Sequence, residues 1–285
     1  MTTATRTDVG VTGDVIASAL FAVDPAGPVF TITGVPDAPT RLAVTPGYDT
    51  AAVPAPTVEA WIHGTIFTMG TTYSADGTHT LVVRLTGAAG STWGSKVFVI
   101  DHTAPVTTNN LPTGVLFGAF TVHLNATDNV TGVAKTYYKL DTAMKYSVYG
   151  SGVYVSGWKD HTVYYYSVDK TGNVEAVKHV HFSMRIRTTL TITKSSTKAT
   201  RNHSFTVYGY LSSSGSGVKI TLKYQKPGSA HWYTVTRYTV KSGTRGKWTY
   251  KCVPRTKGLY HFKVTYAGSS TRYKSASPTL AVRVY

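Results

Sequence analysis

The sequence is poor in cysteine, in acidic residues and in long apolar runs. Cys252 is the single cysteine of the 285 residues, so no internal disulfide can form. No stretch approaches the ~20 apolar residues of a membrane-spanning helix, and the first residues lack the basic, apolar and cleavage-site sequence of a secretory signal. No amphipathic helical pattern is present. We therefore predict a chain without a disulfide framework, without a membrane span and without substantial helix.

Acidic residues are absent from the last third of the chain. Residues 184–285 contain eleven Lys, eight Arg and no Asp or Glu, a net charge of +19. Residues 1–183 hold the other 10 basic groups and all 13 acidic ones, a net charge of −3. A field of one sign on one part of a protein attracts polyanions and repels other cations. The charge therefore indicates an anionic partner for residues 184–285, which we call the basic segment.

The motifs that mark common enzyme classes are also missing. The chain has no G-x-S-x-G elbow, no H-E-x-x-H, no P-loop and no Gly-rich dinucleotide turn. Carboxylates are too few for ready acid–base pairing. Cys252 follows Lys251 in an alternating strand and is expected on the core face, where a thiol behaves as an inert small hydrophobe. We expect a protein that is not an enzyme and needs no cofactor.

Strand-forming residues dominate what is present. Thr, Val, Tyr, Gly and Ser are abundant, which is typical of strands and turns. The stretch Tyr260–Tyr266 alternates large apolar with polar residues, as a strand with one buried face requires. Short strands at regular spacing between Gly, Asn and Asp turns favour β-sandwiches.

An internal repeat divides the chain. Phe98–Val106 aligns with Phe21–Val29, with Phe, Asp, Pro and Val in register, and in each a Pro follows an Asp turn. Pro at such a position suits the first strand of a new domain. The predicted domains are residues 25–103, 104–183 and 184–285. Residues 1–24, with a strand at Val15–Val23, are expected to be the tail of a preceding domain, so that the chain would be a fragment of a longer protein.

A second repeat concerns two histidines. Asp76–Val83 aligns with Lys159–Tyr165, and the alignment gives His79 and His161 equivalent places at the start of a strand. Two histidines at one repeated position favour a structural role over a ligand role. The ten histidines of the chain show no metal-binding spacing.

Several motifs carry a family resemblance. Asp101-His-Thr-Ala-Pro105, Ala126-Thr-Asp-Asn-Val-Thr-Gly-Val133 and Ser167-Val-Asp-Lys-Thr-Gly-Asn173 resemble the tandem immunoglobulin-like domains of Gram-positive, especially actinobacterial, surface and secreted proteins. In the basic segment, residues 189–192, 218–224, 246–248 and 266–268 look like a second bacterial immunoglobulin-like type. The resemblance implies an all-β chain of three tandem immunoglobulin-like β-sandwiches at a cell surface or outside the cell. The lack of acidic residues in the basic segment departs from that family.

The alternation of apolar and basic residues along strands identifies candidate residues for polyanion binding. In Val218–Tyr224 the apolar residues alternate with lysines, so the lysines should face solvent. The candidates are Lys219, Lys223, Lys247, Lys251, Arg255, Lys257, Lys263, Arg272 and Lys274. Their expected partner is an anionic cell-envelope polymer or polysaccharide, with nucleic acid bound non-specifically. The alternative is an ordinary polar surface whose lysines protect strand edges from pairing.

Aromatic residues offer a second kind of site. The chain has 20 tyrosines and 5 tryptophans, and exposed rings stack on sugars or bases. The glycan-stacking candidates are Trp158, Tyr137 and Tyr165, whereas Trp61, Trp232 and Trp248 are expected in the core. Cross-strand aromatic pairing for stability is the alternative and is favoured.

Turn residues offer oxygen ligands for a cation. Asp128 with Asn129, Asp141, and Asp169 with Asn173 have the side chains that Ca²⁺ prefers. Their spacing is not that of an EF-hand loop, and Asp and Asn in turns more often bond their own backbone. The prediction is accordingly that no metal is bound.

Three functions follow from these patterns. The first is a monomeric, modular surface or secreted protein in which the other domains act as a stalk or spacer and the basic segment binds an anionic envelope polymer. The second is an adhesin or carbohydrate-binding array that uses exposed Tyr and Trp. The third is a fragment of a larger secreted hydrolase.

Overall fold

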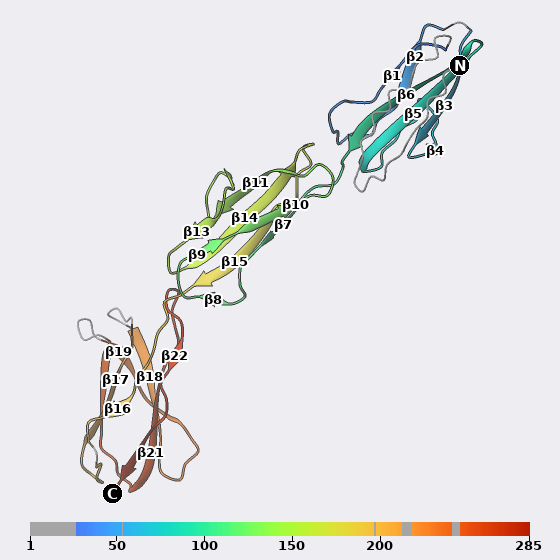
Figure 1. The fold of residues 1–285 in the computed structure, drawn as a ribbon. Helices are drawn as coiled ribbons and strands as arrows, with labels where there is room; N and C mark the ends of the chain where they lie inside the picture. Colours follow the sequence, from blue (N-terminus) through green and yellow to red (C-terminus); the bar gives the residue numbers. More distant parts are fainter. Residues whose placement is uncertain (1–26, 53, 197, 213–217, 241–245) are drawn as a thin grey trace, which may run out of the picture. The chain divides into compact units, whose positions relative to one another are not determined.

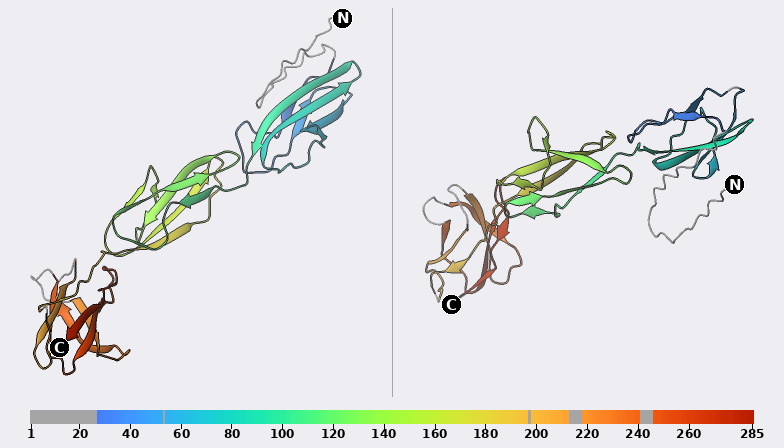
Figure 2. Two further views of the ribbon diagram at one scale, coloured as in Figure 1. Left: turned by 60° about the horizontal axis from the view of Figure 1, so that its bottom comes forward. Right: turned by 45° about the horizontal axis from the view of Figure 1, so that its top comes forward.

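Every regular element in the described part of the chain is a β-strand. The computed structural model describes residues 27–285 apart from 53, 197, 213–217 and 241–245. Within these residues the fold is all-β and immunoglobulin-like, as predicted, and no helix is present that could cross a membrane (Figures 1 and 2). The predicted strand Val15–Val23 and the other residues of 1–24 lie outside the described part of the chain.

The chain divides into two compact units that do not follow the predicted domain limits. The first takes in the described residues up to Thr108 together with Asn125–Thr136 and Tyr166–Ala176. The second holds Asn109–Leu124, Tyr137–Tyr165 and Val177–Tyr285. The three-domain division stays a prediction. Apolar side chains nevertheless gather into three separate cores, which we call the N-terminal, middle and C-terminal cores.

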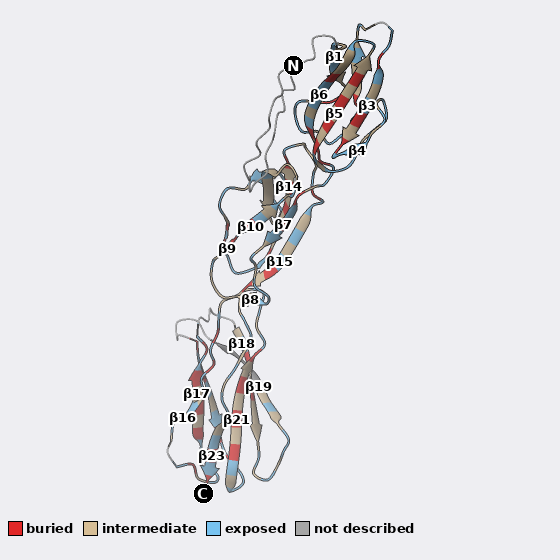
Figure 3. Cartoon of the chain, turned by 45° about the vertical axis from the view of Figure 1, so that its right-hand side comes forward, coloured by how far each residue is buried: buried red, intermediate tan, exposed pale blue. Residues whose placement is uncertain are grey.

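The N-terminal core lies in the first unit. Its strands are β1 (Phe30–Thr33), β2 (Gly47–Thr50), β3 (Thr57–Ile62), β4 (Thr65–Ile66), β5 (Gly77–Gly87) and β6 (Gly90–Ile100). They form a β1–β2 pair and a sheet in the order β4-β3-β5-β6. Alternation along β5 buries Leu81, Val83 and Leu85 and turns the intervening residues outward (Figure 3). The period-two pattern thus produces a sheet with one apolar face.

The middle core draws on residues from Leu111 to Met184. The strands from residue 106 to residue 184 are β7 (Val106–Asn109), β8 (Val115–Leu116), β9 (Phe120–Val122), β10 (Leu124–Thr127), β11 (Val133–Leu140), β12 (Ser147–Val148), β13 (Val153–Val155), β14 (Asp160–Asp169) and β15 (Lys178–Met184). They form a five-stranded sheet in the order β12-β11-β14-β15-β8 and the pairs β10-β7 and β13-β9.

The C-terminal core is built from the basic segment. Its strands are β16 (Thr193–Lys194), β17 (Phe205–Tyr210), β18 (Val218–Gln225), β19 (Tyr233–Val240), β20 (Lys247–Cys252), β21 (Gly258–Tyr266), β22 (Ser275–Ala276) and β23 (Leu280–Val284). One sheet has the order β16-β17-β20, and the other has the order β19-β18-β21-β22 with β23 also paired to β21. The predicted alternation of residues 260–266 is confirmed, because Tyr260, Phe262, Val264 and Tyr266 are buried.

The two repeated histidines have equivalent hydrogen bonds. The Nε2 atom of His79 lies 2.8 Å from the Ala75 carbonyl oxygen, and that of His161 lies 3.1 Å from the Gly157 carbonyl oxygen. Each bond reaches back four residues, and both rings are buried. The sequence repeat therefore corresponds to a repeated structural bond, in agreement with the structural role predicted for this position.

The other ring nitrogen, Nδ1, has a different hydrogen-bond partner in each of the two histidines. His79 Nδ1 lies 2.9 Å from His63 Nε2, whereas His161 Nδ1 lies 3.0 Å from Asp141 Oδ2. His63 and Asp141 both follow the end of a strand and both have a positive φ, 49° and 52°. A histidine thus occupies in the first copy the place that an aspartate occupies in the second.

Candidate polyanion-binding face

The lysines of β18 and β21 share the outer face of one sheet. Lys219 and Lys223 alternate with the buried Ile220 and Leu222, so their side chains point away from the C-terminal core. Lys263 has the same orientation on β21. Lys223 and Lys263 lie directly opposite one another in the antiparallel register. Like charges at such positions destabilise a sheet, so this pair lowers the stability of the folded basic segment.

Two further residues extend the same face. His261 lies two residues before Lys263 on β21, and Arg283 of β23 lies opposite Leu259. Arg283 is exposed. We call the set Lys219, Lys223, His261, Lys263 and Arg283 the β18–β21 face. It contains no carboxylate, because residues 184–285 have none.

Aromatic rings contact several lysines of the basic segment. The Lys263 Nζ atom lies 4.0 Å from the centre of the Trp232 ring, and Lys226 lies 5.0 Å from that of Tyr233. Such contacts hold a cation by the ring quadrupole without neutralising its charge. The prediction that Trp232 is a core residue is wrong. Its ring is half-buried and contacts a lysine of the outer face, because residue 232 precedes β19 instead of alternating within it.

The remaining cationic candidates lie on other surfaces. Lys247 and Lys251 are on the outer face of β20, in the other sheet, and Cys252 is buried as predicted. Arg255, Lys257 and Lys274 are exposed in connections between strands. Arg272 is half-buried, and its backbone forms a parallel bridge with Ile186. The nine nominated residues therefore do not form one surface, and Lys219, Lys223 and Lys263 are the three that the β18–β21 face brings together.

The nominated glycan-stacking residues differ in exposure. Trp158 is 39% exposed and Tyr137 is half-buried. Tyr165 is 4% exposed, packs in the middle core and accepts a hydrogen bond from Asn109 Nδ2 at 3.0 Å. Tyr165 is thus a core residue and the expectation of a stacking role for it is wrong. In the run of three tyrosines along β14, alternation turns Tyr164 and Tyr166 outward and Tyr165 inward.

The other two tryptophans expected in the core differ in their burial. Trp248 is buried in the C-terminal core, as predicted. Trp61 is half-buried and stands on the outer face of β3, between the inward Ala60 and Ile62. Its ring stacks on that of Trp93 of β6, with centroids 5.7 Å apart and planes 23° apart. The core prediction for Trp61 is wrong because the phase of β3 turns it to the opposite side.

Three carboxylates come together in the first unit. Asp101, Asp128 and Asp169 each offer an oxygen within 4.8 Å of the others, and Asp101 and Asp169 are buried. Carboxylate oxygens are ligands that Ca²⁺ prefers, but it takes about 6–8 oxygen atoms, more than these three residues supply with one atom each. Asp141, grouped with Asp128 and Asp169 in the sequence analysis, is engaged instead with His161 and Lys159.

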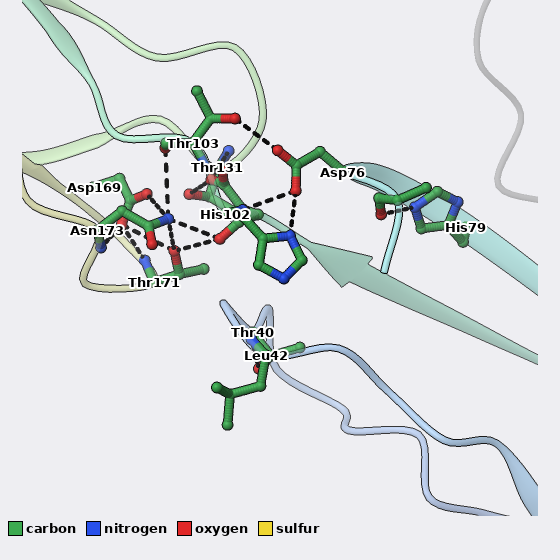
Figure 4. A network of polar contacts seen from close by, with 12 residues as sticks. Thr40, Leu42, Asp76, His79, His102, Thr103, Thr131, Asp169, Thr171 and Asn173 are labelled. Carbon is green, nitrogen blue, oxygen red and sulfur yellow. Dashed lines mark hydrogen bonds and ion pairs between the residues drawn. The ribbon is translucent and has the colours of Figure 1, made fainter. Parts of the chain in front are cut away.

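Most of these carboxylate oxygens already accept hydrogen bonds. Asp169 Oδ1 accepts the backbone N–H groups of residues 171, 172 and 173, and Asp101 Oδ2 accepts the N–H and hydroxyl of Thr131. Asn173 Nδ2 donates to both Asp169 Oδ2 and the Asp101 carbonyl oxygen, each at 2.7 Å (Figure 4). Burial alone would raise the pKa of Asp169, but these bonds outweigh it and hold the pKa below its usual value. The cluster therefore ties residue 101 to the turn at 169–173.

A neighbouring network continues from Asp76. Its carboxylate accepts bonds from the Thr103 hydroxyl at 2.6 Å and from the His102 N–H at 2.8 Å and Nδ1 at 2.7 Å (Figure 4). The Thr103 and His102 bonds lower the pKa of Asp76. The segment 101–103, which the sequence marks as a junction, is thus held by side chains within the first unit. Sequence reasoning singled out Asp101 and Asp169 by motif, but not their contact.

Comparisons with known proteins give likenesses of fold alone. No protein-family profile matches the chain, and no curated protein has a similar sequence. Among solved structures, immunoglobulin domains 1–5 of Sidekick-1 share 12% identity, with a TM-score of 0.36, over 92% of this chain and 60% of that one. The fibronectin(III)-like modules of Clostridium thermocellum CbhA share 11% identity over 55% of this chain and 94% of that one, with a TM-score of 0.29. The FN1–FN3 domains of chicken CNTN1 share 9% identity over 91% and 99%, with a TM-score of 0.28. At these TM-scores the likenesses bear on neither activity nor partners.

Proposed function

We propose that the chain is a non-enzymatic, modular protein of the cell surface or the extracellular space whose basic segment binds an anionic envelope polymer. The observation that carries the proposal is the directly opposed pair Lys223 and Lys263, which shares an acid-free face with Lys219 and Arg283. A polyanion lying along this face would neutralise the repulsion within the pair. The other sandwiches serve as spacers.

The chemistry of the face favours a flexible, regularly charged chain over a small ligand. The cationic groups stand on neighbouring strands, which lie about 4.8 Å apart, and along strands at every second residue, about 6.6 Å apart. Phosphate or carboxylate groups repeated along a polymer can reach several such cations at once. Binding of this kind is driven by release of counterions and weakens as salt is added.

The test compares two pairs of lysines in the full chain. Lys223→Gln with Lys263→Gln removes the opposed pair, and Lys247→Gln with Lys251→Gln removes two lysines from the other sheet of the same segment. Binding of purified wall teichoic acid is measured by calorimetry at several salt concentrations, with duplex DNA as a second polyanion. We expect the slope of log affinity against log salt to fall by about two for the first pair and by less than about one for the second.

The outcomes separate a site from general charge. If both double variants lose the same affinity and slope, the charge acts without a defined face and the proposal for β18–β21 is wrong. Equal affinity for DNA and wall polymer at matched charge means that binding has no polymer preference. If the unaltered chain binds neither polymer at low salt, the basic segment has no polyanion-binding role.

A further inference from the structure

The outer face of the β4-β3-β5-β6 sheet carries an aromatic pair that the polyanion proposal does not use. Trp61 of β3 and Trp93 of β6 reach across β5 and stack on one another. Trp93 is 41% exposed, although tryptophan gains more than most residues from burial. The pair therefore presents indole surface to solvent in a fixed arrangement.

The pair is held in place from its own sheet. The guanidinium carbon of Arg84, opposite Trp93 on β5, lies 5.3 Å from the centre of the Trp93 ring. Arg84 also forms an ion pair with Glu59, its other cross-strand neighbour, at 3.4 Å, and its Nη2 donates to Ser91 Oγ at 3.3 Å. An arginine bound on three sides fixes the ring beneath it, so little side-chain freedom remains to be lost when a ligand stacks there.

A hollow adjoins each tryptophan. One, of about 470 Å³, is lined by Trp61, Glu59, Tyr48 and Phe67 among others. The second, of about 430 Å³, is lined by Trp93 together with residues of β1 and β6. Both volumes lie within the range of ~300–1,000 Å³ that is usual for small-molecule sites. The two hollows lie on opposite sides of β5, one beside Trp61 at β3 and β4 and the other beside Trp93 at β1 and β6.

Charges on this face are balanced, in contrast to those of the basic segment. Glu59 and Arg84 are the two charged residues on the outer faces of β3, β5 and β6, and they pair with one another. Such a face offers both donors and acceptors and no net field, so it complements a neutral ligand with many hydroxyl groups. Sugar rings whose hydroxyls are equatorial expose C–H groups above and below the ring, and these pack on the electron-rich faces of aromatic rings.

We infer that Trp61 and Trp93, with Glu59 and Arg84 at their edges, form a binding site for a neutral polysaccharide with flat, equatorially substituted rings. The site stacks sugar rings on the indoles, and Glu59 accepts hydrogen bonds from hydroxyl groups. It stands in a different sandwich from the β18–β21 face and does not depend on the polyanion proposal. A chain with both sites would engage one charged and one neutral polymer.

The experiment measures binding of the full chain to cellulose, chitin and xylan by cosedimentation, and to cellohexaose and chitohexaose by calorimetry. All samples contain 1 M NaCl, where the Debye length is about 3 Å and polyanion-type binding is suppressed. Trp61→Ala and Trp93→Ala each remove half of the stack. Tyr210→Ala is the matched control, because Tyr210 is an aromatic residue 42% exposed, close to the 41% of Trp93, and lies in another sheet. Glu59→Gln keeps the volume of the side chain and removes its charge.

We expect at least one of these glycans to bind. Its affinity should fall about tenfold or more in each stack variant and about threefold in Glu59→Gln, and it should stay within twofold in Tyr210→Ala. Far-UV circular dichroism checks that each variant is folded, and Glu59→Gln carries the test if a tryptophan variant is not. The inference is overturned if none of the five glycans binds, if the stack variants bind as the unaltered chain does, or if Tyr210→Ala causes the larger loss.

Discussion

Exchanging His63 for aspartate should reverse how the N-terminal core responds to acid. Burial lowers the pKa of His79, the Ala75 carbonyl opposes this by raising it, and the neighbouring His63 lowers it further. A histidine with a lowered pKa binds fewer protons in the folded than in the unfolded state. Its contribution to stability is therefore present above the ordinary pKa of 6.5 and is lost as the pH falls through that value.

The middle core supplies the comparison from the same chain. At Asp141, burial would raise the pKa, but bonds from the Thr162 N–H, Lys159 and His161 outweigh it and lower the pKa. Stability from such an aspartate is present above its ordinary value of 3.8 and is lost as the pH falls through it. His63→Asp copies this arrangement into the N-terminal core. The substitution suits the backbone, because Asp141 itself has a φ of 52° and His63 has 49°.

The expected change in the free energy of unfolding corresponds to the exchange of one proton. The free energy of unfolding changes by at most about 1.4 kcal/mol per pH unit for each proton exchanged. From pH 6.5 to 5.5 the unaltered N-terminal core should lose up to about that amount. In the variant the new carboxylate favours protonated His79, so its stability should hold or rise over the same interval. Tyr73, 3.4 Å from His79 Nδ1, and Asp76 are the same in both proteins and do not change the comparison.

Pulse labelling with deuterium measures the stability of each core separately. The chain is equilibrated in urea at each pH from 5 to 7.5 and then labelled with deuterium in a brief pulse at one common pH. Protection of β5 peptides reports the N-terminal core and that of β14 peptides the middle core. The reasoning fails if β5 loses no stability between pH 7.5 and 5.5 in the unaltered chain, or if His63→Asp shows the same loss.

Two other predictions concern buried groups. Glu175 accepts bonds from the Thr107 N–H at 2.8 Å, the Thr107 hydroxyl at 2.5 Å and the Ser167 N–H at 3.2 Å, so Glu175→Gln should cost about 2–4 kcal/mol in urea unfolding. A loss below about 1 kcal/mol would show that these bonds are worth little. Burial raises the pKa of Cys252 to about 11, so iodoacetamide at pH 8 should label it only after denaturation. Rapid labelling of the native chain would contradict its place in the C-terminal core.

Alternation was the part of the fold that could be predicted from sequence. Period-two patterns placed Lys219, Lys223 and Lys263 outward and Cys252 inward, because a strand residue's face depends on its neighbours two positions away. The same logic failed at Tyr165, where a run of aromatic residues leaves the phase undetermined until the opposing sheet is known. Local sequence fixes the period of a strand and leaves the choice of face to tertiary packing.

Contacts between strands that are far apart in the sequence could not be predicted from alternation. The Trp61–Trp93 stack depends on the registers of β3 with β5 and of β5 with β6. A shift of one residue in either register would place one ring on the other side. The gathering of Asp101 with Asp169 likewise needs a turn that returns from 68 residues along the chain. The register that aligns His79 with His161 would match residue 63 with residue 145, so the equivalence of His63 and Asp141 is visible only in the structure.

The lack of carboxylates in the basic segment also governs how the charge of the chain changes with pH. Between about pH 4 and 9 the segment can gain charge only at its three histidines, so it stays strongly cationic throughout. Residues 1–183 start at a net −3 and contain seven histidines, enough to make them positive below about pH 6. The opposite polarity of the two parts thus exists at neutral pH and vanishes on acidification. A mildly acid setting would turn a chain with two charge signs into one with a positive net charge in both parts, while the charge of the basic segment changes little.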